Sequence, residues 1–413
     1  MRLSVRRCVW MGVGVWMGVC MGVCGWVVGA VAGDDWPQFR GPDARGVSEG
    51  KPPTEWSETE NVRWKTELPG RGVSSPVVFG QRVYVSCATG TKGERLHTVC
   101  CDLASGRILW HRQLVATGNT ACHPQTSMAA PTPVADPNGV VVLFATGDLV
   151  AYDPDGRIRW YRSLNEDYGP ISNQVGMASS PVQAEGLVIV PMDNVGESFL
   201  TGIDLKDGST RWKVERPREV NWSTPALYRL PGETLVLMQN ADELTAYSAK
   251  TGERKWSFSA NNLATISSPI VVGDRVVVPA DELTLVRPEG NAVKVEWTSN
   301  RARPQAPSAL VYRDRVYVVS GGGITVCVDL KTGKQLWQER AKGPVWASPI
   351  AAGGHVYVFS YDTGTATVFD ADKGTRVASN SLNAEIQATP AIVGDTLLIR
   401  TDRHLYRIGR QQP

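Results

Sequence analysis

Seven tryptophans end successive copies of one sequence phrase in this 413-residue chain. The phrase is a strand-like run, an Asp, a turn containing Gly and a second run that ends in Trp. The set is Trp64, Trp110, Trp160, Trp212, Trp256, Trp297 and Trp337. Self-similarity at a fixed period indicates a repeat architecture. We therefore expect these indoles to dock each repeat against its neighbour.

Each repeat opens with Ser or Thr followed by Pro, and one repeat has Ser308-Ala309 in that place. The prolines are Pro76, Pro133, Pro181, Pro225, Pro269, Pro349 and Pro390. Openings after the first interval lie 40–48 residues apart, close to the ~40–45 residues of one four-stranded propeller blade. No comparable helical period is present after residue 33. The sequence predicts an all-β, eight-bladed propeller of four-stranded antiparallel blades.

The two ends of the repeat region predict how the ring closes. The last unit, residues 388–409, has room for only three strands and lacks a Trp. The phrase around Trp64 precedes the first opening and has no unit of its own. We expect residues 62–68 to complete the last blade, which would remove exposed strand edges. An open solenoid is the alternative, but it would require capping units at its ends.

The N-terminus has the features of a signal peptide. Arg2, Arg6 and Arg7 precede an uncharged run, and Ala30-Val31-Ala32 fits a cleavage site after Ala32. A retained membrane anchor is the alternative. We predict a leader (1–32), a lead-in segment (33–60), a propeller (61–409) and a short tail (410–413). The protein would be exported to the periplasm or cell envelope, with no membrane span in the mature chain.

The charge balance gives no case for nucleic acid as a partner. The chain has 43 Lys and Arg against 41 Asp and Glu, and three of the arginines lie in the leader. A nearly neutral surface lacks the basic excess that binds phosphate backbones. We expect a monomer that binds a protein or peptide partner of unknown identity.

The repeats resemble the pyrroloquinoline-quinone (PQQ) repeat family over residues 61–409. The phrase Asp329-Leu-Lys-Thr-Gly333-Lys-Gln-Leu-Trp337 carries this resemblance, and Ser248 and Ala378 are local departures from it. The resemblance implies the quinoprotein alcohol dehydrogenase-like fold. The family contains PQQ-dependent dehydrogenases and also non-catalytic members, such as the lipoprotein of the β-barrel assembly machinery.

Residues just before each inner strand of a propeller converge on one mouth of its channel. The positions three before each opening are Val73, Ala130, Ala178, Trp222, Ile266, Ala306, Trp346 and Gln387. Those four before are Gly72, Ala129, Met177, Asn221, Thr265, Gln305, Val345 and Ile386. None of these residues is charged. The sequence predicts a ligand site formed by Trp222, Trp346, Asn221, Met177, Gln305 and Gln387, although both tryptophans are also consistent with simple plugging of the channel.

Two insertions adjoin this mouth, residues 116–130 and residues 165–174, and we name them lip 1 and lip 2. Long loops on a rigid ring commonly carry function. Cys122 and His123 in lip 1 are too few to predict a metal site.

The resemblance raises the question of PQQ and calcium. The family's dehydrogenases hold PQQ with cationic side chains, calcium ligands, a catalytic Asp and often a disulfide between adjacent cysteines. Cys100 and Cys101 are adjacent here, but strand alternation would point them to opposite faces. Pairing among Cys87, Cys100, Cys101, Cys122 and Cys327 stays open. We predict no cofactor, no metal and no catalytic residue.

These observations favour an exported, non-catalytic propeller that acts as a binding or scaffold module. One alternative is a PQQ-dependent alcohol or sugar dehydrogenase. The other is a component of outer-membrane protein assembly.

Overall fold

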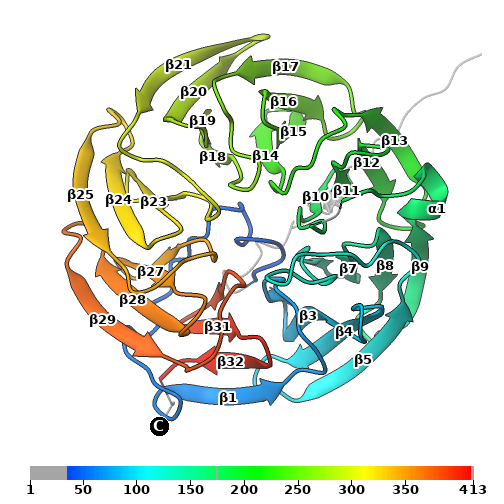
Figure 1. Ribbon diagram of the computed structural model, residues 1–413, viewed down its shortest axis with the longest axis horizontal. Coiled ribbons are helices and arrows are strands. Elements are labelled where there is room, and N and C mark those ends of the chain that lie inside the picture. Colours follow the sequence, from blue (N-terminus) through cyan, green and yellow to red (C-terminus); the bar gives the residue numbers. More distant parts are fainter. Residues whose placement is uncertain (1–34, 174, 411–413) are drawn as a thin grey trace, which may run out of the picture. The chain divides into compact units, whose positions relative to one another are not determined.

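The computed structural model describes residues 35–173 and 175–410, so the expected leader lies outside the described residues. The described residues form eight four-stranded antiparallel sheets, arranged as blades around a central axis (Figure 1). The predicted all-β, eight-bladed propeller is confirmed.

Each blade runs from a short inner strand to an outer strand at the rim. Blades 1 to 4 consist of β2 (Val77–Phe79), β3 (Arg82–Thr89), β4 (Arg95–Asp102) and β5 (Ile108–Val115); β6 (Val134–Asp136), β7 (Gly139–Leu143), β8 (Asp148–Tyr152) and β9 (Ile158–Ser163); β10 (Val182–Ala184), β11 (Leu187–Met192), β12 (Phe199–Asp204) and β13 (Thr210–Glu215); and β14 (Ala226–Leu230), β15 (Glu233–Gln239), β16 (Glu243–Ser248) and β17 (Arg254–Ser259). Blades 5 to 7 consist of β18 (Ile270–Val272), β19 (Arg275–Val278), β20 (Leu283–Glu289) and β21 (Ala292–Ser299); β22 (Leu310–Tyr312), β23 (Arg315–Val319), β24 (Ile324–Asp329) and β25 (Gln335–Arg340); and β26 (Ile350–Ala352), β27 (His355–Phe359), β28 (Thr365–Asp370) and β29 (Arg376–Ser381).

Blade 8 combines strands from the two ends of the repeat region. It consists of β30 (Ala391–Val393), β31 (Thr396–Arg400), β32 (His404–Ile408) and, on its outer side, β1 (Val62–Glu67). β1 pairs antiparallel with β32, from Val62 opposite Ile408 to Glu67 opposite His404. The prediction that the N-terminal strand closes the ring is confirmed.

One short helix departs from the expected all-strand pattern. α1 (Leu164–Tyr168) follows β9 within the second insertion, and its first turn is capped by Ser163, whose Oγ accepts a hydrogen bond from the backbone N–H of Glu166. A five-residue helix is too short to leave a 3.6-residue hydrophobic period in the sequence. Within residues 35–173 and 175–410, no helix has the length and apolar content needed to cross a membrane.

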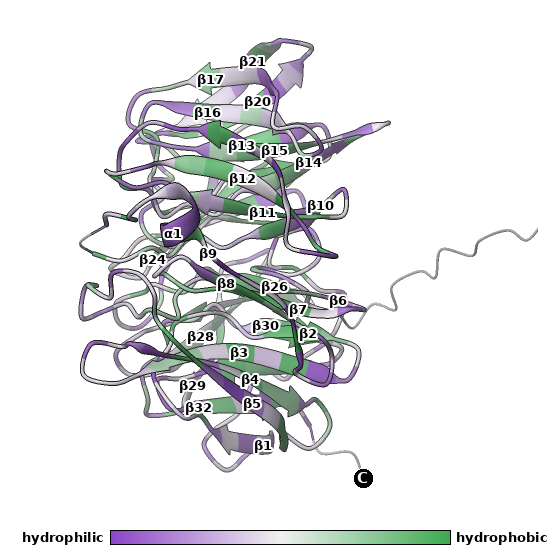
Figure 2. Cartoon of the chain, turned by 90° about the vertical axis from the view of Figure 1, so that its right-hand side faces the viewer, coloured by the Kyte–Doolittle hydropathy of each residue, from purple (hydrophilic) through white to green (hydrophobic). Residues whose placement is uncertain are grey.

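The core lies between the blades, because the middle strands bury both of their faces. β7 and β8 are buried along their whole length, whereas the outer strand β5 buries mainly Trp110. Figure 2 shows the hydrophobic residues of β12 in the same middle position. A strand that is buried on both faces reads as a continuous apolar run, which explains the unbroken valine and leucine stretches of the repeats.

The repeated tryptophans lie between neighbouring blades. In six of the seven, the indole N–H donates to a backbone carbonyl in the turn of the next blade; the acceptors of Trp64, Trp110, Trp160, Trp212, Trp297 and Trp337 are Leu103, Pro154, Leu205, Ala249, Leu330 and Ala371. The turn glycine of the next blade lies under the ring. A Cβ added to Gly156, which has φ of 78°, would lie 2.6 Å from Trp110. The turn glycine therefore supplies both the left-handed backbone and the seat for the indole.

Trp256 is the exception, and its neighbour explains why. Among the described residues, Trp256 is buried but donates no indole hydrogen bond to the next blade. In blade 5 the connection between β20 and β21 is a short turn at Gly290. A Cβ added to Gly290 would meet nothing within 4 Å, so no indole rests on this glycine. Blade 7 departs differently: it has Ala378 at the Trp position, and Trp56 of the lead-in segment is buried in the hydrophobic cluster that Ala378 borders.

The lead-in segment crosses one end of the channel. Trp36 forms an antiparallel bridge with Val78 of blade 1, and Val47 forms a parallel bridge with Ala351 of blade 7. Between them, the buried Arg40 guanidinium donates to the carbonyl of Ala309 in blade 6. Val78 and Ala351 follow the openings of their blades and Ala309 is the last residue of its opening, whereas the lips precede the openings. The lead-in segment and the lips therefore lie at opposite ends of the channel.

A buried histidine in blade 1 predicts that the fold loses stability at acidic pH. His97 Nε2 lies 2.7 Å from Thr89 Oγ1, and its Nδ1 lies 2.9 Å from His111 Nε2. Burial, with smaller contributions from the charges of His111 and Arg95, lowers the pKa of His97 to about 4. Because the folded pKa lies below the unfolded value, this neutral imidazole stabilises the fold above pH ~6.5. That stability is lost as the pH falls from ~6.5 to ~4, on the order of 1–3 kcal/mol.

Urea unfolding of the wild type and His97→Gln across this pH range checks the prediction. We expect the wild type to lose more stability than the variant on acidification. Parallel losses in the two proteins would contradict it.

Candidate functional site

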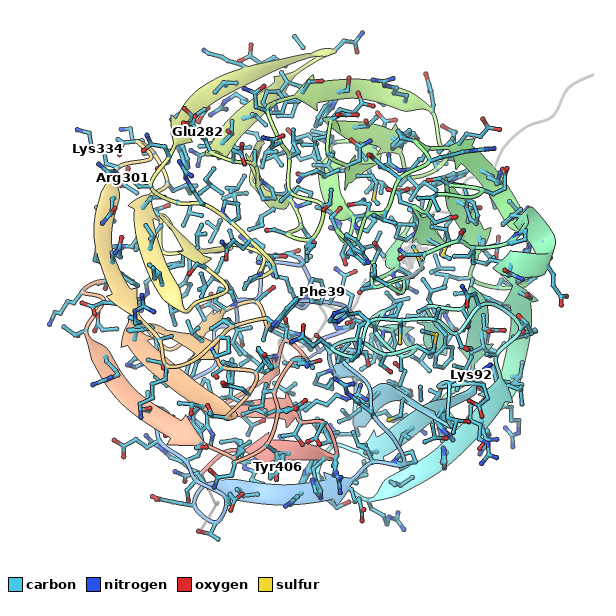
Figure 3. All side chains as sticks on the ribbon, in the orientation of Figure 1. Phe39, Lys92, Glu282, Arg301, Lys334 and Tyr406 are labelled. Carbon is cyan, nitrogen blue, oxygen red and sulfur yellow. The ribbon has the colours of Figure 1, made fainter. Side chains whose placement is uncertain are left out.

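A cavity of about 420 Å³ lies on the axis of the ring. Phe39 of the lead-in segment lines it at one end, and His123, Gln125 and Thr126 of lip 1 line it at the other. Figure 3 shows Phe39 at the centre of the ring. The lining contains no Lys, Arg, Asp or Glu side chain. Its size is typical of small-molecule sites, which span ~300–1,000 Å³.

The wall comes from one position in each blade, three residues before the opening. All eight of these residues line the cavity: Val73, Ala130, Ala178, Trp222, Ile266, Ala306, Trp346 and Gln387. Of the six predicted ligand-contacting residues, the structure therefore places Trp222, Trp346 and Gln387 at the cavity.

The other three predicted residues, Met177, Asn221 and Gln305, do not line the cavity, so the structure does not bring all six together there. Met177 is buried, and its sulfur accepts a hydrogen bond from Asn173. Gln305 is exposed and accepts from the backbone N–H of Gly321. Consecutive residues of an extended segment point to opposite sides, so only one of two adjacent positions can face the axis.

Asn221 belongs to a buried polar cluster inside the ring. Its Nδ2 donates to Asp193 Oδ2 (2.9 Å) and to the Gln239 carbonyl (2.7 Å). Asp193 is also paired with Arg216, at 2.7 Å between Nε and Oδ1, and both side chains are almost fully buried. Burial alone would lower the pKa of Arg216, but the Asp193 carboxylate raises it above its usual value. The cluster fixes the backbone immediately before Trp222.

A belt of eight hydroxyl groups surrounds the cavity, one from the Ser or Thr that opens each blade. The backbone N–H of one belt residue donates to the hydroxyl oxygen of the next blade's belt residue. Seven such bonds of 2.9–3.1 Å run through Ser75, Thr132, Ser180, Thr224, Ser268, Ser308, Ser348 and Thr389. The repeated Ser/Thr-Pro opening was visible in the sequence, but its role in linking blades was not predicted.

The belt is interrupted where blade 8 meets blade 1. Among the described residues, the buried Oγ of Ser75 has no hydrogen-bond partner. Beside it, Arg400 of β31 links the two blades: its guanidinium donates to the Ser74 carbonyl (3.1 Å) and Ser74 Oγ (2.6 Å). A Cβ on Gly72 would lie 2.1 Å from this guanidinium, so the glycine makes room for it. Burial lowers the pKa of Arg400.

Lip 1 contacts the segment that follows lip 2. The backbone N–H of His123 in lip 1 donates to the Val175 carbonyl, just after lip 2 (3.1 Å). Gln125 Nε2 reaches the hydroxyl of Tyr361 in blade 7 (3.3 Å). The base of lip 1 is fixed because Asp148, which is fully buried, accepts from both the N–H and the hydroxyl of Thr117.

Trp222 and Trp346 differ in how they are held. The indole N–H of Trp222 donates to the Gly176 carbonyl at 2.8 Å, which fixes the ring beside lip 2. Trp346 is 42% exposed, and its ring contact is an edge-on approach to Tyr361, with 6.3 Å between ring centroids. Trp222 is thus part of the frame of the mouth, whereas Trp346 presents a free aromatic face.

The residues at this cavity do not fit PQQ, whose three carboxylates need cationic partners. The lining carries no cationic side chain, and the buried guanidinium groups of Arg40 and Arg400 are directed at backbone carbonyls around it. In the described part of the chain, no group of three or more His, Cys, Asp or Glu is arranged to hold a metal ion.

The adjacent cysteines also lie away from the cavity. Cys100 and Cys101 are unpaired and belong to hydrophobic clusters on opposite sides of β4. Burial, with smaller effects from neighbouring charges, raises the pKa of each thiol to about 12. The expected opposite orientation is confirmed, and both residues act as small core side chains.

Comparison with known proteins places this geometry in context. A family model described as outer membrane protein assembly factor BamB matches residues 53–195, 100–262, 196–312 and 297–409. The protein of that name from Bordetella pertussis is 22% identical over 360 residues, which cover 84% of this chain and 75% of that protein. The one from Burkholderia pseudomallei is 25% identical over 348 residues, covering 80% and 82%.

Two solved structures share the fold. BamB from Moraxella catarrhalis superposes with a TM-score of 0.64 at 15% identity, covering 85% of this chain and 98% of that one. A europium-containing methanol dehydrogenase superposes with a TM-score of 0.70 at 12% identity, covering 89% of each chain. The fold therefore occurs both in BamB and in a methanol dehydrogenase, so the fold alone does not indicate a function.

Proposed function

The chain belongs to the family described as outer membrane protein assembly factor BamB, and from this membership we propose that it is a non-catalytic binding propeller of the periplasm that takes part in outer-membrane protein assembly. Its relatives over most of its length carry that name. Its partner in this proposal is a protein of the assembly machinery, which the propeller binds as a rigid scaffold.

The uncharged lining of the axial cavity is the observation that carries the proposal. Trp346 and Ile266 are 42% and 40% exposed there, and Val175 beside lip 2 is also exposed. Exposed apolar groups gathered at one concave surface are characteristic of interaction sites. The lips frame this patch and are held in place by Asp148 and Trp222, so the surface is formed before a partner arrives. Preorganisation of this kind lowers the entropic cost of binding.

A PQQ-dependent dehydrogenase is the less supported alternative. It would need cationic and acidic side chains at the axis, and the cavity lining consists of apolar, hydroxyl, amide and imidazole groups. Burying three carboxylates among such groups without compensating charges would be strongly unfavourable.

The assembly role is tested by affinity purification of the tagged full-length chain from the envelope of its native cell. We expect barrel-assembly components to be recovered with the wild type and to be depleted at least fivefold with Trp346→Ala. Leu336→Ala is the matched control, because Leu336 is 48% exposed but lies on the outer strand β25. Absence of assembly components from the wild-type sample, or equal recovery with both variants, would contradict the proposal.

A further inference from the structure

Three aromatic side chains line the axial cavity from different parts of the chain. Phe39 comes from the lead-in segment, Trp222 from the segment before blade 4 and Trp346 from the segment before blade 7. None of the three is fully buried, and Trp346 is 42% exposed, so a ligand in the cavity can reach them. Aromatic rings attract one another in edge-on or offset-stacked contacts, in addition to the area that they bury. The cavity therefore suits an aromatic ring.

The cavity is reached from the end that carries the lips. The lead-in segment crosses the other end and is fixed there to blades 1, 6 and 7. A cavity of about 420 Å³ that is crossed at one end suits one large side chain better than a chain that passes along the axis. Because its lining has no charged side chain, a charged group would lose its hydration there without compensation. The group that fits is neutral and apolar.

A second pocket, of about 690 Å³, adjoins the cavity over blades 8 and 1, and we name it the side pocket. Gln125 and Gln387 line both the cavity and the side pocket, so a ligand in one lies beside the other. Unlike the cavity, the side pocket has charged walls. Its charged side chains are Glu67, Arg71, Glu385, Asp402 and Arg403.

Carboxylates are in excess in the side pocket. Asp402 pairs with Arg403, at 3.6 Å between Oδ2 and Nε, and the guanidinium of Arg71 donates to the Pro124 carbonyl. Glu67 and Glu385 form no ion pair within the part of the chain that the structure describes. Charge complementarity of this kind selects a basic partner over an acidic one, and the selection weakens as salt is added.

We propose that the axial cavity receives one aromatic side chain from an extended segment of a partner protein, and that basic residues next to this side chain bind the carboxylates of the side pocket. An aromatic anchor in a water-excluding pocket is the usual centre of a protein interface. The inference rests on the proposed function in taking the partner to be a protein, and it adds which kind of segment that partner presents.

Isothermal titration of the full-length protein with four capped peptides tests this inference. The peptides are Ac-Lys-Phe-Lys-NH2, Ac-Gln-Phe-Gln-NH2, Ac-Glu-Phe-Glu-NH2 and Ac-Lys-Ala-Lys-NH2. We expect the first to bind with Kd below ~1 mM. Replacing its Phe by Ala should weaken binding at least ~10-fold. Replacing both Lys by Glu should weaken it about 3- to 10-fold at low salt, with the Gln peptide between the two.

Two variants assign the two parts of the site. Ala306→Leu adds apolar atoms to the cavity wall and should weaken binding of all three Phe peptides at least ~10-fold. Ala292→Leu is its matched control, because it adds the same atoms at an exposed position of β21, and it should leave binding unchanged. Glu385→Gln should reduce the preference for the Lys peptide over the Glu peptide and leave binding of the Gln peptide unchanged. Melting temperatures of the variants verify that each one is folded.

The inference would be overturned if Ac-Lys-Phe-Lys-NH2 did not bind, if the Phe and Ala peptides bound equally, or if folded Ala306→Leu bound as the wild type does. An unchanged preference in Glu385→Gln would overturn the role of the side pocket. Recovery of assembly components by a protein that binds none of the peptides would contradict this inference alone. Peptide binding by a protein that recovers no assembly components would contradict the proposed function instead.

Discussion

Deletion of residues 62–68 is expected to abolish cooperative folding of the propeller, even though the segment lies near one end of the described chain. It removes β1, exposes the edge of β32 and takes away Trp64, which is buried and hydrogen-bonded to Leu103 of blade 1. Loss of such a buried aromatic alone costs about 3–5 kcal/mol. Because domains are stable by only ~5–15 kcal/mol, the added loss of a strand should exceed the margin.

Circular dichroism melting and the yield of soluble protein measure this effect. Glu67→Gln serves as the control, because it changes an exposed side chain of the same strand without removing any strand pairing. A truncated protein that melts cooperatively near the wild-type Tm would contradict the closed ring.

Trp160→Ala is expected to destabilise the fold by about 3–5 kcal/mol. Trp160 is buried between blades 2 and 3, stacks over Gly208 and donates its indole N–H to the Leu205 carbonyl at 3.0 Å. Urea unfolding would measure the loss, and Trp346→Ala is the comparison, because its exposed ring should contribute less than ~1 kcal/mol. Equal losses at the two positions would show that blade-docking tryptophans have no special role.

A conservative pair separates the indole hydrogen bond from packing. Trp160→Phe removes the indole N–H that donates to the Leu205 carbonyl, whereas Trp256 makes no such hydrogen bond to the next blade among the described residues. We expect Trp160→Phe to cost about 1 kcal/mol more than Trp256→Phe. The same cost for both would mean that the tryptophans act through packed area alone.

The architecture could be predicted because the signals for it are local and repeated. The spacing of the Trp and Pro positions gives the blade length, and the unmatched phrase at Trp64 gives the closure. Both depend on strand periodicity, which a single sequence displays directly. α1 was missed because five residues are too few to show a period.

The site was predicted in part, and the limit is physical. Counting back from each opening found the wall residues Trp222, Trp346 and Gln387, but the sequence alone could not say which of two adjacent positions faces the axis. Phe39 and Arg400 were missed because their neighbours lie far away in the chain: Phe39 reaches the cavity from the lead-in segment, and Arg400 joins the last blade to Ser74 of the first. No spacing rule encodes such contacts.

The claim that this propeller binds without catalysing is tested most directly by adding PQQ and Ca²⁺ to the purified protein and measuring dye-linked oxidation of primary alcohols and aldose sugars. The neutral cavity, without a cationic side chain in its lining, predicts no turnover above that of the cofactor in buffer. Turnover that requires the folded protein and is abolished by a calcium chelator would contradict the account.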